Sequence, residues 1–94
     1  MSMDEKLCYE IRIKGRVQGV GFRHSAVREA KKNGITGYVR NAADGSVEIE
    51  AEGSRDSLND FVEWCRKGPG FGYVESVTAD PKPPGNYNDF RIEW

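Results

Sequence analysis

Long apolar runs are missing from this chain of 94 residues, and so is any excess of charge of one sign. No stretch approaches the roughly 20 apolar residues that a membrane-spanning helix needs, and the opening MSMDEKL lacks the hydrophobic core of a signal peptide. The formal net charge is −1, so no general basic field would attract nucleic acid or an anionic membrane. We therefore expect a cytoplasmic protein that binds neither, and any anion binding must be local.

Cysteine is scarce as well, since Cys8 and Cys65 are the only two. Two cysteines are too few for a disulfide framework, and two isolated thiols do not make a metal site. Cys8 falls on the polar face of an alternating strand, whereas Cys65 lies on the apolar stripe of a helix. If that helix packs on the apolar face of the strand, the sheet separates the thiols. We expect both to be free, and we expect no metal or other cofactor.

Repeats, low-complexity tracts and linkers are absent too. The composition, 37% hydrophobic and 31% charged, is that of an ordinary globular protein, and this length allows one modest core. We therefore expect a single domain over residues 1–94. Apolar and polar residues alternate in the manner of strands over residues 7–14, 35–42, 46–53, 73–79 and 90–94. Helical spacing predicts helices over residues 22–33 and 54–67.

Turn and capping residues support these boundaries. Gly34 can close the first helix, and Ser54 is a suitable N-cap for the second, which Gly68-Pro69 ends. Asp44-Gly45 is a strong hairpin signal between the second and third strands.

The order strand-helix-strand-strand-helix-strand is that of the split βαβ arrangement. Right-handed crossovers put both helices on one face of the sheet. We therefore expect an α+β fold, a ferredoxin-like βαββαβ sandwich whose antiparallel sheet carries two helices on one face and a short fifth C-terminal strand. The other face should be open to water.

That open face is expected to carry a solvated ladder of charges. Its members come from the first and third strands: Glu10, Arg12, Lys14, Glu48, Glu50 and Glu52. RNA-binding modules have the same order of elements, but they present aromatic residues on the third strand for base stacking. Glutamates at those positions would repel phosphates, so RNA binding is not expected.

The stretch GRVQGVGFR, residues 15–23, contains three glycines and no acidic residue. Glycines allow positive φ and a close approach to a ligand, and consecutive amides in such a loop can turn inward around an anion. The loop leads into a helix, whose first amides lack acceptors and carry the positive end of the dipole. Arg23, in the first turn, adds a planar fork that can bind two phosphate oxygens. These features favour a local anion site.

The glycines alone favour a tight turn before a helix, because such short patterns are common by chance. Two well-known nucleotide loops do not fit, because position 24 is His24 rather than a third glycine, and Phe22-Arg23 replaces the Lys-Ser/Thr of a Walker A motif. His24 itself points away from Arg23 around the helix, and we expect it to be a surface or packing residue.

Asn41 lies near the end of the second strand, whose C-terminal end shares a sheet edge with that of the first strand. If Val39 is buried, Asn41 points to the helix side, where the glycine loop enters its helix. A polar amide there suits a group that positions water. A turn asparagine bonded to its own backbone is the alternative. The water-positioning role of Asn41 is favoured only if Asn41 lies beside Arg23.

With its continuation GITGYVRNAADGSVEIEAEG, residues 34–53, the glycine stretch strongly resembles the acylphosphatases from about Leu7 to Trp94. The resemblance implies the same ferredoxin-like fold, with the catalytic arginine at Arg23 and the catalytic asparagine at Asn41. It also implies that phosphate is bound by the loop residues and the arginine: Arg16, Val17, Gln18, Gly19, Val20, Gly21, Phe22 and Arg23. We expect the side chain of Arg16 itself to be solvated.

The resemblance implies hydrolysis of acyl phosphates to a carboxylate and inorganic phosphate, a reaction that needs no metal ion. We expect the protein to be a monomer. A ferredoxin-like binding module without turnover remains an alternative. Another is the acylphosphatase-like domain that begins larger maturation proteins handling carbamoyl phosphate. A chain that starts with Met1 and ends with its closing strand favours the free-standing enzyme.

Overall fold

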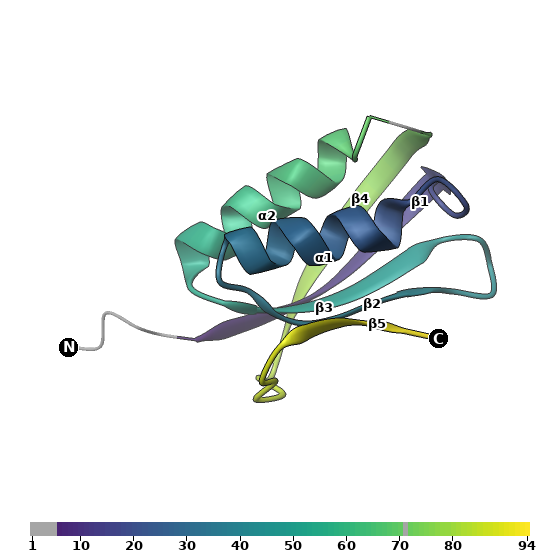
Figure 1. Cartoon of the computed structure of the whole chain (residues 1–94). Coiled ribbons are helices and arrows are strands. Elements are labelled where there is room, and N and C mark those ends of the chain that lie inside the picture. Colours follow the sequence, from purple (N-terminus) through teal and green to yellow (C-terminus); the bar gives the residue numbers. More distant parts are fainter. Residues whose placement is uncertain (1–5, 71) are drawn as a thin grey trace.

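Two helices lie side by side on one face of a five-stranded mixed sheet (Figure 1). The computed structural model describes residues 6–70 and 72–94. In chain order the elements are β1 (Leu7–Arg16), α1 (Phe22–Lys32), β2 (Thr36–Asn41), β3 (Val47–Gly53), α2 (Arg55–Lys67), β4 (Tyr73–Lys82) and β5 (Phe90–Glu93). Neither α1 nor α2 has the length and hydropathy needed to cross a membrane.

The strand order is β4-β1-β3-β2-β5. The pairs β4–β1, β1–β3 and β3–β2 are antiparallel, whereas β5 pairs with β2 as a parallel edge strand. The predicted α+β ferredoxin-like sandwich is thus confirmed, with both helices on one face. Since β1 and β2 are each antiparallel to β3, they run in the same direction and end at the same edge of the sheet.

The core lies between the helices and the sheet because each helix has one apolar stripe. The buried residues of these stripes are Phe22, Ala26 and Ala30 in α1 and Leu58, Phe61, Val62 and Cys65 in α2. Phe61 packs between two aromatic rings, with its centroid 6.1 Å from that of Trp64 and 5.9 Å from that of Phe90. Burying a side chain of this size stabilises the fold by about 1.5–3 kcal/mol.

The predicted capping residues stand where the helices begin and end. Ser54 Oγ accepts a hydrogen bond from the Ser57 amide at 3.2 Å, which caps α2. At the end of α1, the Gly34 amide donates to the Lys31 carbonyl and the Ile35 amide to the Ala30 carbonyl. This pair of bonds is a Schellman motif, and it turns the chain directly into β2.

The prediction that the outer face of the sheet is open was wrong at one end. Cys8 and Glu52 are only 2% and 1% exposed, because the connection between β4 and β5 folds beneath the sheet (Figure 1). The Glu52 carboxylate accepts hydrogen bonds from the backbone amides of Asn86, at 3.2 Å, and Tyr87, at 2.9 Å. Cys8 and Cys65 are both free and lie on opposite faces of the sheet, as predicted.

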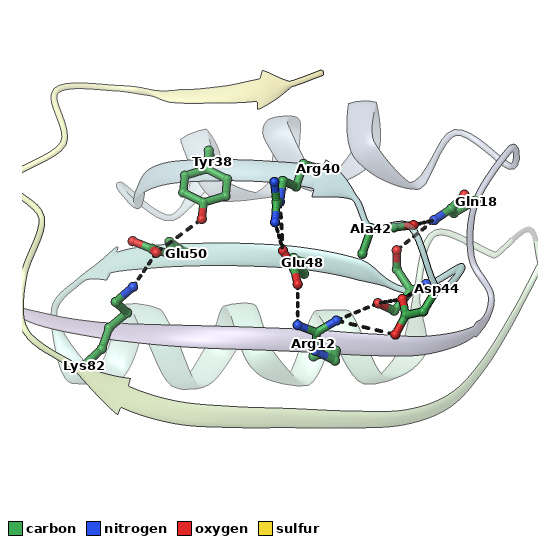
Figure 2. Close-up of polar contacts among 10 residues, drawn as sticks. Arg12, Gln18, Tyr38, Arg40, Ala42, Asp44, Glu48, Glu50 and Lys82 are labelled. Atoms are coloured by element: carbon green, nitrogen blue, oxygen red, sulfur yellow. Dashed lines mark hydrogen bonds and ion pairs between the residues drawn. The ribbon is translucent and has the colours of Figure 1, made fainter.

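The charge ladder was also only partly correct. Arg12 binds Glu48 as expected, but Glu10 stands opposite Glu50, and the partner of Glu50 is Lys82 of β4 (Figure 2). Hydroxyl groups of Tyr38 and Tyr87 also donate to Glu50. The side chains of Glu48 and Glu50 are only 14% and 13% exposed, so the ladder is partly buried on β3, whereas Glu10 and Lys14 of β1 are exposed.

Strand β4 continues to Lys82, beyond the predicted end at residue 79, and includes Pro81. A proline signals a turn because it lacks an N–H donor. At the edge of a sheet the lost donor can face outward, so Pro81 does not interrupt the pairing of β4 with β1.

Candidate active site

The loop between β1 and α1 passes through left-handed backbone conformations at two glycines. Gly19 has φ 76° and Gly21 has φ 81°, values that residues with a Cβ atom rarely adopt. A Cβ atom at either position would meet nothing within 4 Å. The backbone conformation, rather than crowding by the protein, therefore requires glycine in this loop.

The N-terminus of α1 is left without an internal cap. Its N-cap residue is Gly21, no side chain bonds to the first amides, and the first turn contains no acidic residue. The other helix has both a serine cap and Asp56 in its first turn. Unpaired amides and the positive end of the helix dipole together favour an anion at the start of α1.

Side chains on either side of the glycines anchor this loop in the core. Val17 is 1% exposed and Phe22 is 2% exposed, and the Phe22 ring lies 5.4 Å from the Trp64 ring. Val20 is partly buried, whereas Arg16 is exposed, as predicted for a solvated side chain. His24 is exposed as well. The loop is therefore fixed at both ends while its glycines remain open.

Arg23 follows the loop in the first turn of α1 and is half-buried. Its guanidinium makes no hydrogen bond or salt bridge within residues 6–70 and 72–94. The guanidinium carbon lies 4.4 Å from the centroid of the Trp94 ring, a cation–π contact. The five N–H donors of Arg23 thus remain available to a ligand.

Asn41 is the last residue of β2 and continues the row of Gly37 and Val39, both of which are buried. Its Oδ1 atom is buried and has no hydrogen-bond partner in the described part of the chain. The alternative of a turn asparagine bonded to its own backbone is not observed. A buried carbonyl without a partner costs free energy, so this amide contributes little to the stability of the fold.

Gln18 joins the loop to the turn between β2 and β3 (Figure 2). Its Nε2 donates to the backbone carbonyls of Ala42 and Ser46, each at 2.8 Å. Ala42 directly follows Asn41, so the two predicted segments of the site are held within hydrogen-bonding distance of each other. The sequence suggested only the backbone of Gln18 as a ligand, and its side-chain bridge was missed.

The same turn is held from the other face of the sheet by Arg12 (Figure 2). Arg12 Nη1 donates to Ser46 Oγ at 2.9 Å and lies 3.7 Å from Asp44 Oδ2. The Ser46 hydroxyl and amide both donate to Asp44, at 2.6 and 3.0 Å, which lowers the pKa of that carboxyl. Arg12 also binds Glu48, which Arg40 Nε reaches at 2.8 Å. The turn that follows Asn41 is thus fixed from both sides.

The residues described contain no group of three or more His, Cys, Asp or Glu side chains that could hold a metal ion. The groups without a hydrogen-bond partner among the described residues at this edge of the sheet instead include the guanidinium of Arg23 and the carboxamide oxygen of Asn41, beside the uncapped amides of α1. Such a set can bind an oxyanion and orient a neutral molecule beside it.

Known proteins share both the sequence and the fold. The family model described as acylphosphatase matches residues 9–92. The acylphosphatase of Thermotoga petrophila is 45% identical over 85 residues, which cover 90% of this chain and 94% of that one.

Solved structures agree. An acylphosphatase from Coxiella burnetii has a TM-score of 0.93 and 35% identity, covering 99% of this chain and 100% of that one. Full-length HypF, solved in a phosphate- and nucleotide-bound form, has a TM-score of 0.92 at 26% identity, and the match covers 99% of this chain but only 12% of HypF. The family model and the T. petrophila relative both extend over most of the sequence. This chain therefore belongs to the acylphosphatase family.

Proposed function

We propose that this acylphosphatase cleaves the carboxyl–phosphate bond of acyl phosphates with Arg23 and Asn41 as its catalytic residues and without a metal ion. The observation that carries the proposal is the open anion site at the start of α1. There the uncapped amides adjoin an arginine that has no anionic partner among residues 6–70 and 72–94.

In this proposal the phosphoryl group sits in the glycine loop. Its oxygens accept hydrogen bonds from the backbone amides of residues 16–22, and the Arg23 fork binds two of them at once. Phosphoryl transfer passes through a loose transition state, so positioning and charge stabilisation supply most of the catalysis. The loop amides and Arg23 provide both.

Asn41 orients the attacking water. Its side chain makes no hydrogen bond within the described residues, so the amide can rotate about χ2 without losing a protein partner. That rotation turns Oδ1 toward a water molecule near the phosphoryl group, while the bridge from Gln18 to Ala42 keeps the neighbouring backbone in place.

The leaving group needs no general acid. A carboxylic acid has a pKa of about 4, so the carboxylate departs in its ionised form at neutral pH. As the P–O bond to the carboxylate breaks, the water oxygen bonds to phosphorus, and a phosphoryl oxygen of the substrate takes the water proton. The products are a carboxylate and inorganic phosphate.

An assay of acetyl and benzoyl phosphate in the presence of EDTA tests this function, with a phosphate monoester as the comparison substrate. We expect turnover of both acyl phosphates with the chelator present and little turnover of the monoester, whose alkoxide leaving group requires protonation. Activity on the monoester alone would contradict the proposal. Binding of phosphate without any turnover would identify a binding module instead, and loss of activity with EDTA would contradict the metal-free mechanism.

A further inference from the structure

Trp94 is the most exposed large hydrophobic side chain of the described residues, at 90% exposure. It follows β5 directly and continues the alternation of Phe90 and Ile92, which face the helices and the core. A tryptophan has a large apolar surface, and exposing it to water is unfavourable unless a ligand or partner covers it.

The ring lies beside the proposed phosphate site rather than at a remote surface. One face of the indole contacts the Arg23 guanidinium, whose central carbon is 4.4 Å from the ring centroid. Since the side chain is 90% exposed, the opposite face of the ring is open to solvent. A phosphoryl group held by Arg23 would therefore place the rest of its molecule next to an open aromatic face.

We propose that Trp94 binds the acyl group of the substrate and favours planar aromatic acyl phosphates over small aliphatic ones. This inference rests on the proposed function, in which Arg23 holds the phosphoryl group. The acyl carbon is attached to phosphorus through a single oxygen, so the acyl group begins at the rim of the loop. A planar ring at that point can stack on the indole, whereas a methyl group covers little of it.

Trp94 also lines a groove of about 380 Å³ that opens on the outer face of the sheet. Trp94 lies at one part of its lining, which also includes Tyr38 and Tyr87, whose rings are 6.0 Å apart in an edge-to-face arrangement. The charged residues of the lining, Arg40 and Glu93, stand opposite each other in the β2–β5 register. The groove therefore adds aromatic surface with balanced charge beyond Trp94, which suits a bulky neutral acyl body.

The test compares benzoyl phosphate with acetyl phosphate for the wild type and for Trp94→Ala, Trp94→Leu and Trp94→Phe. Stacking is a contact that ground state and transition state share, so its loss should raise KM and leave kcat nearly unchanged. We expect Trp94→Ala and Trp94→Leu to raise KM for benzoyl phosphate roughly three- to tenfold and that for acetyl phosphate less than about twofold. Trp94→Phe, which keeps a planar ring, should restore most of the preference.

Two further measurements separate the possible outcomes. Lys32→Ala changes an exposed residue at the C-terminal end of α1 and should alter KM and kcat for neither substrate. Inhibition by inorganic phosphate reports on the loop amides and Arg23 without any contribution from an acyl group. An equal rise in KM for both substrates, or weaker phosphate inhibition, would mean that Trp94 only positions Arg23. Unchanged constants in every variant would also overturn the inference. A wild type that hydrolyses neither acyl phosphate would instead contradict the proposed function.

Discussion

At the scale of single residues, two polar side chains do little for the stability of the fold. Arg23 stands in the first helical turn, where a positive charge opposes the dipole, and has no anionic partner in the described part of the chain. Asn41 buries a carboxamide oxygen without a hydrogen bond. Side chains whose local interactions are unfavourable in this way are expected at functional sites. Substitutions at these two positions should therefore separate activity from stability.

Replacing Arg23 with lysine should lower kcat/KM for benzoyl phosphate by about a hundred- to a thousandfold, close to the loss in Arg23→Gln. Lysine keeps the charge but cannot present two parallel donors to a phosphoryl group. Arg28→Lys is the matched control, because Arg28 is exposed on the same helix. Turnover near the wild-type level in Arg23→Lys would show that the charge alone suffices.

The Asn41→Ala variant should lose turnover while its inhibition constant for inorganic phosphate stays within about twofold of that of the wild type. The free energy of unfolding in urea should stay unchanged or rise, because the substitution removes a buried acceptor that has no partner. Asn59→Ala, at an exposed position of α2, serves as the control. Phosphate affinity that fell together with turnover would place Asn41 in phosphate binding instead.

Glycines before a helix and an amide near a strand end pointed to Arg23 and Asn41 in the sequence, and the resemblance to the acylphosphatases supplied their predicted catalytic roles. The side chains of Gln18 and Trp94 could not be assigned in that way. Gln18 bonds to two backbone carbonyls that are 24 and 28 residues away, and no periodicity reports which carbonyls a loop will meet. Trp94 was read only as the end of a strand, and its contact with Arg23 depends on how β5 adds to β2.

At the scale of elements, the site is a loop and a turn joined by one side chain. Gln18 supplies both hydrogen bonds between them, and Arg12 fixes the turn from the opposite face of the sheet. The position of Asn41 relative to the loop therefore depends on contacts made by residues other than Arg23 and Asn41.

Replacing Gln18 with glutamate tests this connection with almost no change in shape. A carboxylate cannot donate to the carbonyls of Ala42 and Ser46, and its charge would oppose a bound phosphate. We expect the free energy of unfolding to fall by about 1–3 kcal/mol and phosphate inhibition to weaken. Gln18→Ala should show the loss of stability with a smaller effect on phosphate, because it adds no charge. Urea denaturation and inhibition kinetics provide both readouts, and wild-type stability in the two variants would contradict the bridging role.

The order and type of the elements were predictable because the apolar periodicity changes clearly between strands and helices and because Ser54 and Gly34 mark helix ends. The end of β4 and the covered part of the outer face were not. Pro81 indicates a turn unless the strand is known to lie at an edge. Burial of Glu52 required knowing that the connection after β4 returns beneath the sheet and offers its amides to that carboxylate.

At the scale of the whole molecule, the partly buried carboxylates on the outer face link stability to pH. Hydrogen bonds from Arg40 lower the pKa of Glu48 despite its burial, and Arg12 acts in the same direction. Burial alone would raise the pKa of Glu50, but hydrogen bonds from Lys82 and Tyr87 outweigh it and lower the pKa. A carboxylate with a lowered pKa stabilises the native state fully above its ordinary pKa of about 4.5, and this contribution is lost as the pH falls through that value toward the native pKa.

Glu48→Gln should therefore reduce the free energy of unfolding at neutral pH, and it should flatten the loss of stability between about pH 5 and pH 3. Urea denaturation over this range measures both effects. Glu63→Gln is the control, since the side chain of Glu63 is 71% exposed and its pair with Arg66 should contribute little. If the Glu48 variant and the wild type lost the same free energy of unfolding between these pH values, other groups would be responsible for the pH dependence of stability.

Because α2 has a capped N-terminus and α1 does not, we expect local unfolding to begin at the first turn of α1. The beginning of α2 is closed by its own serine, whereas the beginning of α1 depends on whatever anion occupies the loop. In the free enzyme we expect the amides of the first turn of α1 to exchange with deuterium faster than those of α2. Phosphate, a product of the reaction, should slow that exchange and raise the melting temperature. At a hundredfold excess over its dissociation constant, it should add about 2.7 kcal/mol to the free energy of unfolding. The enzyme would then be most resistant to unfolding while it is turning over.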